Sequence, residues 1–183
     1  MAKRLVLSAT LAVCALLAAG CGSSDDASSD ATPTTEWADG LCSSITTWQS
    51  EITTIVDSLK AGSLSQDSLS AAVDDAEEAT RNFTTSLKSL GRPDTEAGQK
   101  AQDSVNELTT QIDEDMTTIQ DTVSNAEGVA GIIAAVPTIT TTIQSAGNQV
   151  ADTIAGFEDL DAKGELESAF KDAESCKTMT AGS

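Results

Sequence analysis

The chain has 183 residues, with 29 acidic and 10 basic side chains, no histidine, and a net charge of −19 at pH 7. A surface this acidic repels phosphate backbones, which excludes nucleic acid as a partner, whereas it can attract cations, basic proteins and basic cell-wall components. Without histidine, serine triads of the usual kind are excluded, and the commonest general base and zinc ligand is missing.

The first twenty residues have the pattern of an export signal. Lys3 and Arg4 precede a mostly apolar run over residues 5–19, and small residues lead from this run to Cys21. Basic residues, an apolar stretch and small residues in this order are the three parts of such a signal. The run is too short to span a bilayer as a mature helix. The pattern therefore predicts export of the chain.

The sequence Ala-Ala-Gly-Cys that ends at Cys21 resembles the processing site of bacterial lipoproteins. The resemblance implies that signal peptidase II removes residues 1–20 and that Cys21 becomes a lipid-carrying N-terminus on the extracytoplasmic face of the membrane. The leucine usual three residues before the cysteine is replaced by Ala18. Because Ala18 and Gly20 also suit an ordinary secretory peptidase, simple secretion and an uncleaved anchor are the alternatives.

The four cysteines have three expected fates. Cys14 leaves with the signal and Cys21 takes the lipid, so Cys42 and Cys176 remain in the mature chain. An even pair in an oxidising compartment is typical of a disulfide. This bond would close a loop that contains nearly the whole mature domain. In the chain-entropy model, such a bond raises the free energy of unfolding by about 4 to 5 kcal/mol. Two buried free thiols or a two-ligand metal site are the alternatives.

Residues 21–35 are predicted to be a lipidated, flexible tether. From residue 22 to residue 35 the chain contains only Gly, Ser, Asp, Ala, Thr and one Pro. Such a composition buries too little apolar surface to offset the entropy of ordering the chain. As a random coil of about fourteen residues it reaches on the order of 20 Å. The folded domain is then predicted over residues 36–178.

The rest of the chain has the hydrophobic periodicity of amphipathic helices. Apolar side chains step by three and four residues over four stretches, at about residues 35–60, 65–90, 94–127 and 131–160. Ser65 and Asp94 are expected to cap the second and third helices. Gly131 and Pro137 are expected to disturb the start of the fourth helix. A short fifth helical segment, residues 166–173, is expected to close the domain.

Four helices of about 25 residues joined by short loops favour an all-α fold, an up-and-down antiparallel four-helix bundle with the short fifth segment. In this topology the first helix starts and the fourth ends at the same end of the bundle, so Cys42 and Cys176 can meet. Residues 129–136 are the most apolar part of the mature chain. They are predicted to be a loop packed over the end of the bundle or a buried helix start, with a small-residue contact surface as the alternative.

Carboxylates are the remaining candidates for chemistry, but most fall between the apolar positions, where they are solvated. Asp159, Asp161 and Glu167 stand at the first, third and ninth positions of a stretch that resembles an EF-hand calcium loop. Lys163 occupies the place of the fifth ligand and Phe170 that of the bidentate glutamate. The alternative is that the acids flank a helix end and face water. We predict no catalytic residue, no cofactor and no metal site.

The mature chain is similar in kind to the small, acidic, helical lipoproteins of actinobacteria, and this resemblance brings no catalytic residues with it. We predict a non-enzymatic interaction or scaffolding module of the cell envelope, with a well-filled core and a partner that has a basic face. The alternative is a carrier or receptor that holds a lipid or a small apolar molecule between its helices, where alanines would leave room. These are Ala76, Ala101, Ala126 and Ala146. The third hypothesis is a hydrolase that uses paired carboxylates.

Overall fold

The computed structural model describes residues 31–61 and 65–181. These residues form six helices and two short strands: β1 (Ala31–Thr32), α1 (Thr34–Ala61), α2 (Gln66–Ser89), β2 (Arg92–Pro93), α3 (Gly98–Ser124), α4 (Gly128–Leu160), α5 (Glu165–Asp172) and α6 (Glu174–Ala181). The predicted export signal and Cys21 lie outside the described residues.

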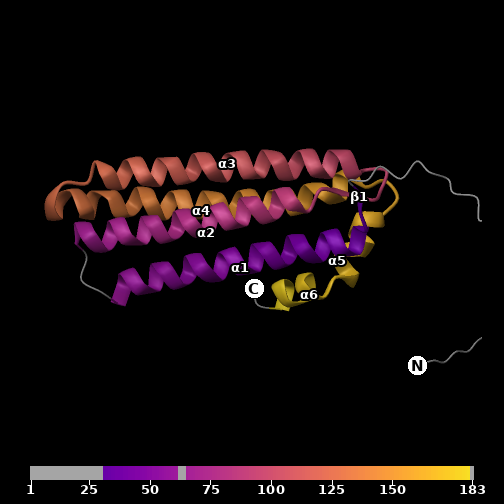
Figure 1. Ribbon diagram of the computed structural model, residues 1–183, viewed down its shortest axis with the longest axis horizontal. Coiled ribbons are helices and arrows are strands. Elements are labelled where there is room, and N and C mark those ends of the chain that lie inside the picture. Colours follow the sequence, from indigo (N-terminus) through magenta and orange to yellow (C-terminus); the bar gives the residue numbers. More distant parts are fainter. Residues whose placement is uncertain (1–30, 62–64, 182–183) are drawn as a thin grey trace, which may run out of the picture.

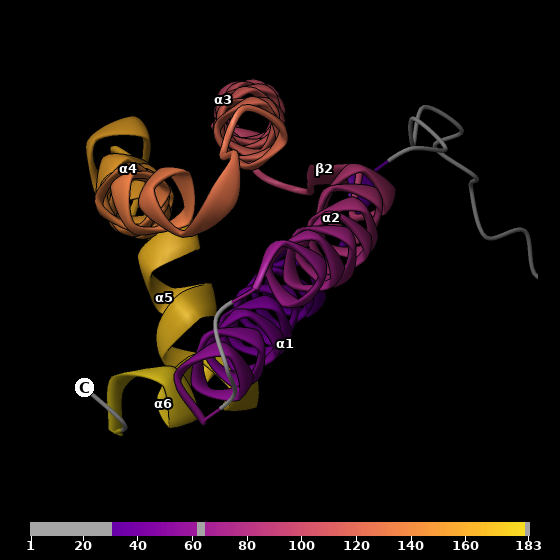
Figure 2. The ribbon, with the colours of Figure 1, turned by 90° about the vertical axis from the view of Figure 1, so that its left-hand side faces the viewer.

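The four long helices run up and down along one axis, so the predicted all-α bundle is confirmed (Figure 1). α1 packs against α2, α2 against α3, and α3 against α4. The fourth side of the bundle is not closed in the same way, because the backbones of α1 and α4 stay apart. Figure 2 shows α5 between them at the end where α4 finishes. At the other end no described element lies between α1 and α4, and the apolar side chains that both helices turn towards this space are only half-buried; we call this the open side of the bundle.

The predicted tether is wrong for residues 31–35, because the folded domain begins at residue 31. β1 forms a parallel pair with β2, and α1 begins at Thr34. The Thr32 hydroxyl donates to the carbonyl of Leu90 at 2.7 Å, and the backbone N–H of Asp94 donates to the carbonyl of Thr32 at 2.8 Å. This segment is held by polar bonds to a distant turn, which its composition does not reveal.

The helix boundaries confirm one predicted cap and correct two other expectations. Ser65 caps α2 in a capping box, in which its hydroxyl accepts from the N–H of Ser68 at 3.1 Å. Asp94 does not cap α3, which begins only at Gly98, because the Asp94 backbone bonds to β1 instead. α4 starts at Gly128 and continues through Pro137. Pro137 is exposed, so the carbonyl that it leaves without a helical partner can bond to water.

The hydrophobic core has two parts along the bundle. At the end near α5, Trp37 makes edge contacts with Phe157 at 5.5 Å and Phe170 at 6.2 Å, and its indole N–H donates to the carbonyl of Gly91. The core at the other end comes from α2, α3 and α4. α1 adds no fully buried side chain beyond Trp48, and its later apolar side chains are half-buried or exposed.

The closing segment consists of two helices, α5 and α6, rather than the one that was predicted, and both pack against α1. Cys42 of α1 and Cys176 of α6 form a disulfide, with their Cα atoms 5.1 Å apart, which confirms the predicted pairing. Asp39 of α1 accepts a hydrogen bond from the backbone N–H of Ser175 at 2.8 Å, and this bond lowers the pKa of the Asp39 carboxyl. The carboxylate thus caps the start of α6, a role for which the sequence carries no local signal.

Candidate functional site

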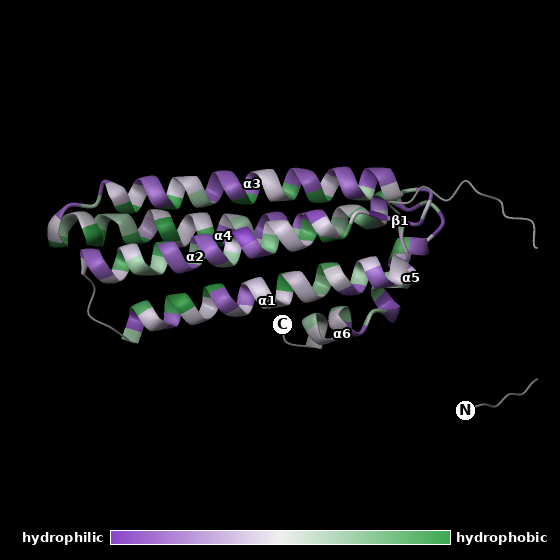
Figure 3. Ribbon diagram, in the orientation of Figure 1, coloured by the Kyte–Doolittle hydropathy of each residue, from purple (hydrophilic) through white to green (hydrophobic). Residues whose placement is uncertain are grey.

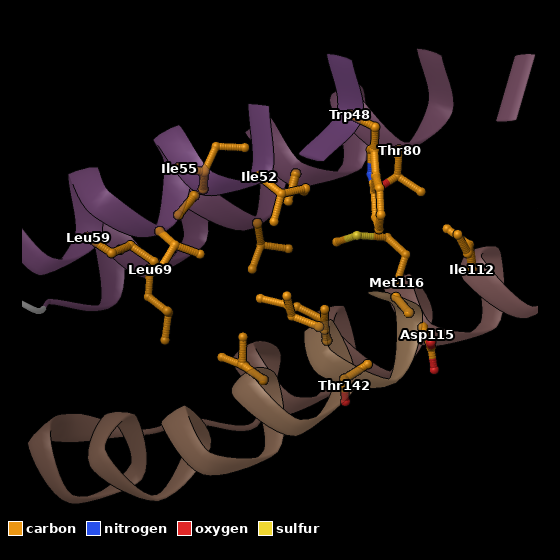
Figure 4. Close-up of a pocket in the computed structure, with 18 residues that line it drawn as sticks. Trp48, Ile52, Ile55, Leu59, Leu69, Thr80, Ile112, Asp115, Met116 and Thr142 are labelled. Carbon is orange, nitrogen blue, oxygen red and sulfur yellow. The ribbon is translucent and has the colours of Figure 1, made fainter. Parts of the chain in front are cut away.

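An apolar groove lies in the half of the bundle that is far from the disulfide, where α1 and α4 stay apart (Figure 4). Aliphatic side chains from all four long helices point into it, and they enclose a space of about 70 Å³. They include Ile52 and Ile55 of α1, Val73 and Ala76 of α2, Met116 and Ile119 of α3, and Ile139 and Ile143 of α4. Such a lining removes apolar surface of a ligand from water but offers it few hydrogen bonds.

Trp48 closes one end of the groove, and Leu59 and Leu69 lie at the other (Figure 4). The Trp48 ring stacks on Phe83, with ring centroids 5.0 Å apart, and its indole N–H donates to the Thr80 hydroxyl at 3.3 Å. Because both contacts hold the ring in place, Trp48 is a fixed wall that limits the length of a ligand inside the groove.

Two of the four alanines that the sequence singled out, Ala76 and Ala146, line the groove. Ala101 and Ala126 are buried elsewhere. An enclosed space of about 70 Å³ holds about five water-sized spheres. It therefore admits a segment of a slim, chain-like apolar molecule, and the remainder of such a molecule would extend to the open side between α1 and α4.

Among the described residues that line the groove, Asp115 is the only one with an ionisable side chain. Partial burial raises its pKa above the ordinary range of an aspartate, and the neighbouring charge of Glu114 adds to the rise, although a hydrogen bond from Gln149 opposes it. The Gln149 amide N–H donates to Asp115 Oδ2 at 3.1 Å and to Ser145 Oγ at 3.2 Å. The amide oxygen of Gln149 is buried without a hydrogen-bond partner. The ionised carboxylate is thus less favourable here than in the unfolded chain.

Asp115→Asn is expected to raise the melting temperature at pH 7. A raised pKa means that folding stability is lost as the pH rises through the pKa, and an uncharged side chain avoids this loss. The new amide can also donate to the unpartnered oxygen of Gln149. Thermal unfolding at several pH values checks the sign, since the advantage of the variant should shrink towards pH 3, where the wild-type carboxyl is protonated as well. A lower melting temperature at pH 7 would contradict this account.

The stretch that resembles a calcium loop has a structural role. Asp161 Oδ2 accepts hydrogen bonds from the backbone N–H groups of Leu166, at 2.5 Å, and Glu167, at 3.2 Å, at the start of α5. Gly164 has a φ of +72°, a left-handed conformation that glycine adopts without strain, and Asp159 is exposed. In residues 31–61 and 65–181 no group of three or more Cys, Asp or Glu side chains is placed to hold a metal ion. The acids here stabilise a helix start.

Paired carboxylates occur on the outer surface rather than in the groove. Glu51, Asp75 and Glu78 line a shallow hollow between α1 and α2, and all three are exposed. Asp113 faces solvent next to Lys88, at 3.9 Å. The described residues therefore do not bring two carboxylates into the apolar groove, which is the arrangement that the hydrolase hypothesis requires.

The start of α4 is more exposed than its composition suggests. Residues Gly128–Phe157 are long and apolar enough to cross a membrane by length and composition, yet only 22% of the most apolar window is buried. Ile132 and Ala135 face the core, whereas Val129, Ile133 and Val136 are exposed. The predicted loop is therefore wrong, because residues 129–136 are helical, and the predicted buried helix start is wrong for the five of these eight residues that are exposed.

The groove itself was not located from the sequence, because the opening depends on which helices pack together. One feature of the sequence could have pointed to this part of the bundle. Residues 128–151 carry no charge, in a chain where a fifth of the residues are charged. No protein-family model, curated protein or solved structure matches this chain. The functional argument therefore rests on the geometry of the groove and of the start of α4.

Proposed function

We propose that this protein is a carrier or receptor that binds a slim apolar ligand, such as a single acyl chain, between its four long helices. The main support for this proposal is the groove, since aliphatic side chains of α1, α2, α3 and α4 surround a space that the packed core leaves open. The scaffolding hypothesis predicted a well-filled core without such a space. The geometry therefore favours the carrier hypothesis over it.

Burial of the ligand's methylene groups supplies the binding free energy, at about 0.8 kcal/mol for each buried group. Hydrogen bonding adds little, because Thr80 is already bonded to Trp48 and Thr142 donates to the carbonyl of Thr138. Selectivity then comes from shape. The Trp48 wall favours chains that end there, and bulky rings do not fit a space of about 70 Å³.

The charge of the domain limits the head group of the ligand. The acidic surface repels a carboxylate or phosphate head at the mouth of the groove, so a neutral or cationic head is favoured. The single carboxylate of Asp115 in an aliphatic lining supports binding rather than hydrolysis, and we propose a non-enzymatic role.

We further propose that the protein acts on the extracytoplasmic face of the membrane, held by a lipid on Cys21. The disulfide between Cys42 and Cys176 supports this location, because such bonds persist in oxidising compartments.

A quenching titration tests the groove. A brominated monoacylglycerol, added below its critical micelle concentration, is expected to quench the fluorescence of Trp48 in a saturable way. Ala76→Leu fills the groove and should weaken binding at least tenfold, which corresponds to about 1.4 kcal/mol.

Ala71→Leu is the matched control, since Ala71 lies on the exposed side of the same helix. This variant should bind as the wild type does. Absence of saturable quenching in the wild type would refute the carrier proposal. So would a folded Ala76→Leu variant that binds the ligand as tightly as the wild type does.

A further inference from the structure

A stripe of exposed apolar side chains runs along the start of α4, outside the lining of the groove. Val129 is 73% exposed, Ile133 64% and Val136 40%. Their spacing of four and three residues places them on one side of the helix. Figure 3 shows this end of α4 in white and green, without the purple segments that alternate along α3. We call these three residues the α4 stripe.

The α4 stripe borders the open side of the bundle. Val129, Val136 and Ile143 are seven residues apart, so they follow one line along α4. Ile143 lines the groove and is half-buried. The stripe thus continues the apolar surface of the groove towards the start of α4, where no described element covers it.

The domain that carries the α4 stripe is strongly acidic. Residues 128–151 of α4 carry no charged side chain. Residues 51–61, 66–81 and 113–127 of the other long helices, at the same end of the bundle (Figure 1), carry twelve acidic and two basic side chains. An uncharged strip on so acidic a domain favours a partner that is apolar in the middle and basic at its edges.

We propose that the α4 stripe docks an amphipathic helix with basic flanks, supplied by another protein. The apolar side of that helix covers Val129, Ile133 and Val136, and its lysines and arginines are attracted by the acidic domain. A second copy of this chain is disfavoured because it brings two acidic domains together, and an anionic membrane surface meets the same repulsion. The inference is independent of the groove ligand, since none of the three side chains lines the groove.

Fluorescence anisotropy with three labelled 18-residue peptides tests this proposal on the processed, full-length protein. The first is an amphipathic Leu/Lys helix, the second has the same composition in scrambled order, and the third replaces Lys by Glu. The first peptide is expected to bind at least tenfold more tightly than the other two, and its binding should weaken as salt is added.

The variant V129S/I133S/V136S is expected to lose at least tenfold in affinity for the first peptide without loss of core packing, because the three side chains are exposed. Ala130→Ser, Ala134→Ser and Thr141→Ser together form the matched control on exposed positions of α4 outside the stripe. Equal binding of the scrambled peptide, or unchanged binding by the stripe variant, would overturn the proposal. So would sedimentation that shows a dimer of the wild type alone and a monomer of the stripe variant.

Discussion

Replacing Cys42 and Cys176 together by serine is expected to lower the free energy of unfolding by about 2 to 5 kcal/mol. The two cysteines are 134 residues apart, so the disulfide greatly restricts the unfolded chain. In the folded state it holds α6 against α1, together with the bond between Asp39 and Ser175 and apolar contacts between the two helices. The double replacement avoids leaving a single reactive thiol.

Urea unfolding followed by circular dichroism measures this loss. The wild type treated with a thiol reductant is the control, and its unfolding midpoint should coincide with that of the double variant. Hydrogen exchange should show the earliest gain of exchange in residues 174–181. Equal midpoints for the oxidised wild type and the double variant would contradict the expected contribution of the bond.

Cys21→Ser is expected to abolish lipid attachment. Cys21 follows small residues at the end of the apolar run, and the lipid requires its thiol. Metabolic labelling with palmitate should label the wild type and not the variant. In detergent phase partition, the variant should move from the detergent phase to the aqueous phase if the secretory peptidase cuts it. If no peptidase cuts it, the variant should appear as an uncleaved precursor of higher mass.

Cys14→Ser is the matched control, because Cys14 belongs to the segment whose removal is predicted. It should keep both the palmitate label and the partition of the wild type. Label that persists in Cys21→Ser, or that is absent from the wild type, would exclude the lipoprotein interpretation.

The helices and the disulfide could be predicted because their signals are local or simple. Apolar side chains at three- and four-residue steps define α1 to α4, and the N-cap at Ser65 depends only on neighbouring residues. The pairing of Cys42 with Cys176 followed once the other two cysteines were assigned to the signal and the lipid. An even number of long helices also brought their ends together.

The features that escaped prediction depend on contacts between distant parts of the chain. β1 exists because Thr32 bonds to the turn after α2, and α6 is held by Asp39 and the disulfide rather than by strong amphipathicity. The opening between α1 and α4 follows from the position of α5. The periodicity of α1 is the same before and after Trp48, although only the first part is fully buried.

The position of β1 determines the end of the bundle at which the N-terminal segment joins the domain. β1 lies at the end of the bundle where α5 packs, and the turn from α3 to α4 lies at the opposite end (Figure 1). The 28 residues of α1 span about 42 Å at 1.5 Å per residue. If Cys21 carries the proposed lipid, the molecule is attached by the end that holds β1, and the groove and the α4 stripe lie in the half remote from the attachment point. An acyl chain would then leave the bilayer before it is bound, and a partner could take it over at the distal tip.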